Sequence, residues 1–132
     1  MEKINIRTSR RTELLDITAE VQNIVSKSKV KEGICFLFCP HTTAGLTINE
    51  NADPSVKRDI INTLTKLVPE NAGYAHTEGN ADSHIKSSLF GQTLTIFIEA
   101  GQLALGTWQG ICFCEGDGPR SRQVWIRVTK ET

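Results

Sequence analysis

Hydrophobic and polar positions follow a strand-like pattern along most of this chain. Residues 3–8 (KINIRT) and 45–50 (GLTINE) alternate most clearly, which is typical of strands with one buried face, and Leu46 and Ile48 are expected to face inward. Residues 34–39 (ICFLFC) are apolar throughout, so this strand is predicted to be buried on both faces. Further strands are predicted at residues 12–17 (TELLDI), 92–100 (QTLTIFIEA), 108–115 (WQGICFCE) and 122–129 (RQVWIRVT).

Helical periodicity interrupts these strands at three places. Thr18 is predicted to cap a first helix whose apolar stripe contains Val21, Ile24 and Val25. A second helix is predicted between Asp53, a good N-cap followed by Pro54, and Pro69. A third, short helix (DSHIKSSLFG, 82–91) is predicted to have its cap at Asp82 and to end at Gly91. The predicted fold class is therefore α+β, a single domain over residues 1–132, with an antiparallel β-sheet sandwich and two to three helices.

Composition narrows the classes of partner. Fifteen basic and fifteen acidic residues balance, which disfavours a broad nucleic-acid or anionic-membrane surface. No apolar run approaches the roughly 20 residues of a membrane span, and the segment MEKINIRTSRRTELL lacks the apolar centre of a signal peptide. We expect a cytoplasmic protein whose four cysteines are reduced and buried in the core.

The three histidines are the first candidates for chemistry. His41 follows a predicted buried strand, and His76 and His84 flank the segment HTEGNADSH, in which NAD precedes a helix. Three neutral imidazoles plus a water would form the open geometry of catalytic zinc, so His41, His76 and His84 are candidate metal ligands. The same segment is also consistent with an acid–base site or with a polar loop, and the spacing alone leaves all three interpretations open.

Acids and arginines near the predicted element ends supply further candidates. Glu78 and Glu115 have no evident capping role, so each is a candidate to orient a histidine or to act as a general base, against the alternative of a solvated loop acid. Arg120 and Arg122 are two residues apart, hence on one strand face, and their guanidinium groups suit phosphate oxygens. The glycines around Trp108 (GTWQG) could present backbone N–H groups to an anion, or serve only a turn.

Three long motifs carry a family resemblance: HTTAGLTINENADPSV, HTEGNADSHIKSSLFG and GQLALGTWQGICFCEGDGPRSRQV. Together they resemble the YjbQ family, also called the secondary thiamine-phosphate synthase enzyme family. The match extends from about His41 to the C-terminus. By this likeness the site residues are His41, His76, His84, Glu78, Glu115 and Arg120, with Asn80 and Gln109 in neighbouring motifs.

The resemblance implies a small α+β protein that assembles as a homotrimer. It also implies a thiamine-phosphate synthase-like transferase, which joins hydroxymethylpyrimidine diphosphate to a thiazole phosphate and releases pyrophosphate, as a main or a side activity. The alternatives are a metal- or phosphate-binding trimer without physiological turnover and a metal-assisted hydrolase. In each case the expected ligand is a phosphorylated small molecule, with a divalent metal, zinc before others, as the expected cofactor.

Overall fold

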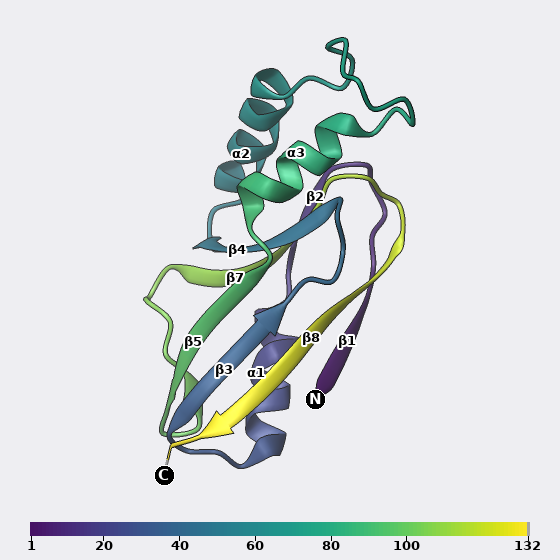
Figure 1. The fold of residues 1–132 in the computed structure, drawn as a ribbon. Coiled ribbons are helices and arrows are strands. Elements are labelled where there is room, and N and C mark those ends of the chain that lie inside the picture. The colour runs from purple at the N-terminus through teal and green to yellow at the C-terminus, as the bar shows by residue number, and fades with distance from the viewer. Residues whose placement is uncertain (132) are drawn as a thin grey trace.

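Eight strands and three helices make up residues 1–131, the part of the chain that the structure, a computed structural model, describes (Figure 1). In chain order they are β1 (Glu2–Arg7), β2 (Glu13–Asp16), α1 (Thr18–Ser28), β3 (Gly33–Phe38), β4 (Ala44–Glu50), α2 (Pro54–Leu67), α3 (Ala81–Phe90), β5 (Thr93–Glu99), β6 (Gln102–Leu103), β7 (Gln109–Glu115) and β8 (Ser121–Lys130). The predicted α+β class is confirmed; the short strand β6 was not predicted.

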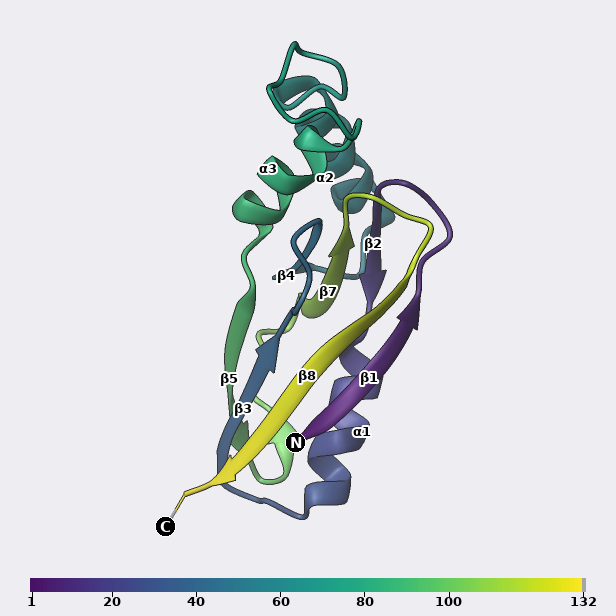
Figure 2. The same cartoon turned by 45° about the vertical axis from the view of Figure 1, so that its right-hand side comes forward.

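The strands form two antiparallel sheets. The larger sheet has the order β1-β8-β3-β5-β6 and the smaller has the order β2-β7-β4. Figures 1 and 2 show α2 and α3 together at one end of the molecule and α1 nearer the end where both termini lie. No helix in residues 1–131 combines the length and the apolar character needed to span a lipid bilayer.

The hydrophobic core lies between the two sheets and α1. Its centre contains fully buried side chains from different elements, among them Val21, Leu37, Leu46 and Phe113. The prediction that residues 34–39 are buried on both faces is wrong. Phe36 and Phe38 are each 42% exposed, because β3 lies in an antiparallel sheet whose outer face is open in the single chain.

The helix ends agree with the sequence in part. Asp53 caps α2 as predicted, since its Oδ1 accepts the Ser55 N–H at 2.9 Å, and Pro54 is the first helical residue. Thr18 is not the cap of α1: it is the first helical residue, and its N–H donates to Asp16 Oδ1 at 3.0 Å. The predicted cap at Asp82 is also wrong, because α3 begins at Ala81 after Asn80, and Asp82 is fully buried inside the helix.

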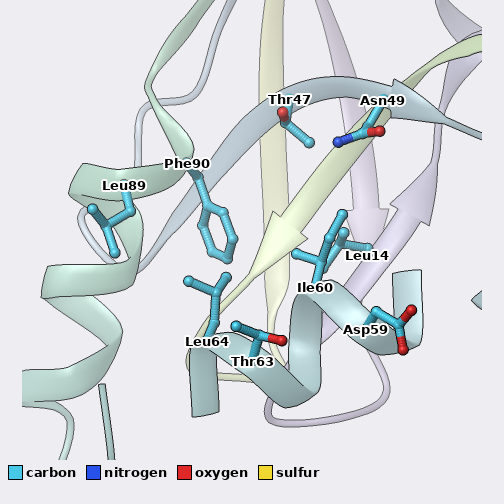
Figure 3. A pocket seen from close by; sticks show the side chains of 9 residues that line it. All are labelled: Leu14, Thr47, Asn49, Asp59, Ile60, Thr63, Leu64, Leu89 and Phe90. Carbon is cyan, nitrogen blue, oxygen red and sulfur yellow. The ribbon is translucent and has the colours of Figure 1, made fainter. Parts of the chain in front are cut away.

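The apolar stripe of α2 is only partly covered, since no residue of this helix is fully buried. Figure 3 shows why: Ile60 and Leu64 of α2 face Phe90 of α3 and Leu14 of β2 around a cavity of about 460 Å³. The cavity lining also includes Thr47, Asn49, Asp59, Thr63 and Leu89. Helix α2 therefore contacts the rest of the protein along a groove and leaves part of its stripe open.

Candidate functional site

Four segments far apart in the sequence meet at the N-terminal end of α3. They are the turn between β1 and β2, the segment 39–43 after β3, the turn between β7 and β8, and α3 itself, which lie close together in Figure 1. Hydrogen bonds connect them: the Ser83 hydroxyl donates to the Gly116 carbonyl oxygen, the Gly116 N–H to Thr43 O at 3.0 Å, and the Gly118 N–H to Arg11 O at 3.0 Å. This meeting point brings most of the candidate residues together.

A polar cavity of about 370 Å³ occupies this place. Its lining contains six of the candidates together with four neighbouring residues: His41, Glu78, Asn80, His84, Arg120 and Arg122, with Pro40, Thr42, Thr43 and Asp117. A second cavity, of about 560 Å³, shares Pro40, His41, Thr42 and His84 with it and extends toward Phe38 and Gln92. His41 and His84 therefore stand between a charged space and a more apolar one.

His41 has a fixed tautomer. Its Nε2 accepts the main-chain N–H of Gln123 at 2.9 Å, and a nitrogen that accepts a hydrogen bond carries no proton. The neutral ring therefore has its N–H at Nδ1. Burial lowers the pKa of His41, and the positive charge of Arg122 lowers it further, so the ring is neutral at pH 7. His41 is thus a hydrogen-bond donor without a positive charge.

His76 and His84 lie side by side at the entrance to α3. Their ring centroids are 5.1 Å apart in an edge-to-face arrangement. His76 Nε2 is 3.0 Å from Asn80 Oδ1 and 3.6 Å from Glu78 Oε2, and both His76 and Glu78 are exposed. Glu78 is the acid that is placed to interact with a histidine.

Glu115 has a different environment from the one that the sequence suggested. The carboxylate is fully buried and accepts hydrogen bonds from Arg122 Nε at 2.8 Å, from Arg122 Nη2, from the Thr8 hydroxyl at 2.8 Å and from the Asp117 N–H at 3.0 Å. Burial raises the pKa of Glu115, but these hydrogen bonds outweigh it and hold the pKa below its ordinary value. Its oxygens are occupied by these hydrogen bonds and by the ion pair with Arg122, and of the two partners it is Arg122 that lines the cavity.

Sequence reasoning missed a set of charged residues that positions α3. Asp82 is fully buried, and it accepts hydrogen bonds from Lys86 Nζ at 3.0 Å and from Arg11 Nη2 at 2.9 Å. Arg11 Nη1 is also 3.6 Å from both Glu70 and Asp117. The spacing of Asp82 and Lys86, four residues apart on one helix, was readable as a pair. Arg11 had no such signal, because it lies 71 residues from Asp82.

Arg120 is bound to the turn that precedes it. Its Nε donates to the Asp117 carbonyl oxygen at 2.7 Å and its Nη2 to Asp117 Oδ2 at 3.0 Å, while about half of the side chain is exposed. Asn80 Nδ2 donates to the same Asp117 carboxylate at 2.8 Å. Arg120 therefore faces the cavity with part of its charge already balanced by a carboxylate.

Within residues 1–131, no three His, Cys, Asp or Glu side chains form a group arranged to hold a metal ion. The tautomer of His41 gives a physical reason: Nε2 is occupied by the Gln123 N–H and Nδ1 carries the proton, so neither nitrogen has a free lone pair. As arranged in this single chain, the three histidines do not fit a shared metal. A zinc ion on His41, His76 and His84 would require the His41 ring to turn, and it stays a prediction.

Two other sequence candidates lie outside the cavity. Gln109 begins β7, at the opposite end of the strand from Glu115, and its Oε1 accepts the Gly106 N–H at 2.8 Å. The GTWQG turn thus uses this N–H internally. The four cysteines are free thiols in the core, as predicted, and burial raises the pKa of Cys35 to about 11.

The polar cavity is a better candidate site than the apolar groove beside α2. The groove brings together aliphatic and aromatic side chains with two threonines, Asn49 and Asp59, whereas the polar cavity joins two histidines, two arginines and two acids. His41 and Asp117 have lowered pKa values with identifiable causes, and perturbed pKa values of this kind are typical of functional sites. The arrangement suits binding of a polar, charged small molecule and hydrogen bonding to charge that develops on it.

Comparison with known proteins identifies close relatives. Residues 2–131 match the family described as UPF0047 protein YjbQ-like. The UPF0047 protein MJ1081 of Methanocaldococcus jannaschii is 56% identical over 126 residues, covering 96% of this chain and 91% of that protein. YugU of Bacillus subtilis is 45% identical over 129 residues, covering 97% and 98%. A crystal structure of an uncharacterized conserved YjbQ/UPF0047 protein from Clostridium acetobutylicum is 50% identical, with a TM-score of 0.96 and coverage of 98% and 100%.

Proposed function

This chain belongs to the YjbQ-like UPF0047 family, and from that premise we propose that it is an enzyme acting on a phosphorylated small molecule. The reaction we propose is thiamine-phosphate synthase-like: a hydroxymethylpyrimidine diphosphate is joined to a thiazole phosphate, and pyrophosphate leaves. The proposal for this reaction comes from the family resemblance of the three motifs. The proposal for the place of the reaction comes from the cavity around His41 and His84.

The observation that carries the proposal is the uncharged His41 donor beside two arginines in one cavity. When the bond to a diphosphate breaks, negative charge grows on the leaving oxygens. Preorganised donors that point at this charge lower the barrier without reorganising during the reaction. His41 Nδ1–H and the Arg120 guanidinium are suited to this task, and His84 is suited to move or hold a proton at the boundary of the two cavities.

The proposal is tested by an assay for pyrophosphate release from the two substrates, with and without a chelator. We expect turnover in the wild-type protein and a loss of about 100-fold or more in His84→Ala, which removes a proton-transfer group. Lys66→Ala is the control, because Lys66 is exposed on α2 and lines neither cavity. Turnover that ends when the chelator is added would show that the divalent metal expected as a cofactor takes part in the reaction. Binding of pyrophosphate without any turnover would support a phosphate-binding protein.

A homotrimer is part of the proposal. The outer face of the larger sheet exposes Phe36, Phe38 and Phe97, the last at 66%, next to the half-buried Trp125. Contiguous apolar surface of this kind is typical of protein interfaces. Sedimentation equilibrium is expected to give three times 14.6 kDa for the wild type and a smaller mass for Phe97→Lys. Leu67→Lys, on α2 and 72% exposed, is the control that should keep the trimer. A wild-type mass of one chain would contradict this arrangement.

A further inference from the structure

A third cavity adjoins the proposed site on the other side of His41. It has a volume of about 510 Å³ and is lined by residues of β1 and β8 together with His41: Asn5, Ile6, Arg7, Ser121, Arg122 and Gln123. It shares His41 and Arg122 with the charged cavity described above. None of the residues that line it is acidic.

Arg7 gives this cavity an uncompensated positive charge. Its Nη1 donates to Ser121 Oγ at 2.8 Å, and no carboxylate among residues 1–131 lies within ion-pair distance of its guanidinium. The other arginines around His41 differ in this respect, because Arg122 is paired with Glu115 and Arg120 with Asp117. An anion that enters from solvent therefore gains most from Arg7.

The hydrogen bonds around the cavity use up acceptors and leave donors. The Trp125 indole N–H can only donate, and it donates to Gln123 Oε1 at 3.1 Å, which fixes the orientation of the Gln123 amide. Gln123 Nε2 then donates to Asn5 Oδ1 at 3.3 Å, so the Asn5 NH₂ group is left to face outward. The Trp125 side chain has no acceptor, so it must donate, and this fixes the direction of the two hydrogen bonds that follow.

The remaining polar groups obey the same rule. Ser121 Oγ accepts from Arg7, which leaves the hydroxyl hydrogen to donate. His41 Nε2 accepts from the Gln123 main chain, so this acceptor is used as well. Strand register explains the grouping: Asn5 pairs with Gln123 and Arg7 with Ser121 across β1 and β8, so all four side chains lie on one face of the sheet.

We infer that the cavity formed by Asn5, Arg7, Ser121 and Gln123 is an anion subsite that takes a phosphate group of the substrate. The inference rests on the proposed function, since it assigns one phosphate of a phosphorylated substrate to the side of His41 opposite Arg120. A guanidinium, a hydroxyl and an amide, all donating, match the oxygens of a phosphate and repel a cationic group. Two substrates that both carry phosphate would need two such places, one on each side of His41.

Calorimetric titration with inorganic pyrophosphate, in a phosphate-free buffer at physiological ionic strength, tests the subsite. Removing a charged hydrogen bond costs about 1.5–3 kcal/mol, so Arg7→Gln is expected to weaken binding by about 10-fold to 100-fold. Ser121→Ala is expected to weaken it by a few-fold, because it removes a neutral donor. Arg10→Gln is the matched control, because Arg10 is exposed, lies three residues further along the chain and does not line this cavity. It should bind like the wild type.

Three results would overturn the subsite: no binding of pyrophosphate to the wild type at millimolar concentration, equal weakening in Arg7→Gln and Arg10→Gln, or weakening in Arg120→Gln alone. Thermal unfolding of each variant checks that it is folded; Arg7 is exposed and makes one side-chain hydrogen bond. Pyrophosphate release by the same proteins separates this inference from the proposed function. If the wild type turns over and Arg7→Gln binds pyrophosphate as tightly as the wild type, the subsite is wrong and the proposed function stands. If pyrophosphate binding depends on Arg7 but the wild type releases no pyrophosphate from the substrates, the enzymatic function is wrong and the subsite stands.

Discussion

Replacing Glu115 with glutamine is expected to lower the free energy of unfolding by about 3–5 kcal/mol, the usual effect of removing one partner of a buried ion pair. Glu115 is fully buried and Arg122 is 6% exposed, so the variant leaves a guanidinium charge in the protein interior without its carboxylate. Domains of this kind have a total stability of about 5–15 kcal/mol, so the change is a large part of the whole. Urea unfolding followed by circular dichroism measures it.

Two further variants isolate the cause. Glu99→Gln removes an exposed carboxylate from β5 and is expected to change stability by less than about 0.5 kcal/mol. The double variant Glu115→Gln/Arg122→Met removes the stranded charge and is expected to recover much of the loss, since apolar replacements of buried ion pairs are often tolerated. A loss below about 1 kcal/mol in Glu115→Gln would show that solvent or another group compensates Arg122.

Acid pH supplies an independent check of the same pair. Hydrogen bonds hold the pKa of Glu115 below its ordinary value of 4.5, and Asn80 and Arg120 do the same for Asp117 despite its burial. The unfolded chain therefore takes up protons first as the pH falls. The stability from these carboxylates is complete above about pH 4.5 and is lost as the pH falls through the lowered folded-state pKa values. Glu115→Gln should lose less stability over that range than the wild type.

The sequence predicted those features of the fold that are determined by neighbouring residues, and it did not predict those that depend on distant ones. The limits of α2 were readable because Asp53, Pro54 and Pro69 act on their own neighbours. The exposed face of β3 could not be predicted, because the same apolar residue in a strand can face either the core or an open sheet surface. Asp82, the last residue of the NAD segment, was predicted to be a helix cap. Its hydrogen-bond partners, Lys86 and Arg11, depend on how α3 packs.

The candidate site shows the same division. His41, Glu78, His84 and Arg120 were predicted to lie together because polar residues at element ends tend to gather, and all four line one cavity. Glu115 was assigned to the histidines, whereas Arg122 and Thr8 occupy its oxygens, a choice that only the pairing of β1, β7 and β8 decides. The donor-lined cavity at Arg7 joins Ser121 and Gln123, at the end of the third motif, to Asn5 and Arg7, which lie outside all three motifs. It arises from the register of β1 against β8, two strands at opposite ends of the chain.

His41→Ala is expected to reduce pyrophosphate release by about 10²–10³-fold, the usual effect of removing one donor that stabilises developing negative charge. The physical reason is the fixed tautomer: the Gln123 N–H holds Nε2, so Nδ1–H is available as an uncharged donor. A neutral imidazole in this role has to stay neutral throughout the working pH range. Steady-state kinetics should show the loss mainly in kcat, because the interaction strengthens as the bond to the leaving group breaks.

The pH dependence of wild-type turnover distinguishes this role from that of a protonated acid. Protonating His41 would set an N–H at Nε2 against the Gln123 N–H, and burial and Arg122 already lower its pKa. Turnover should therefore be flat around pH 7 and fall only below the ordinary histidine value of 6.5, as the ring gains its proton. Turnover that rises as the pH falls through 6.5 would mean that imidazolium is the active form. An unchanged rate in His41→Ala would remove His41 from the chemistry and leave Arg120 and His84 as the groups that act on the leaving phosphate.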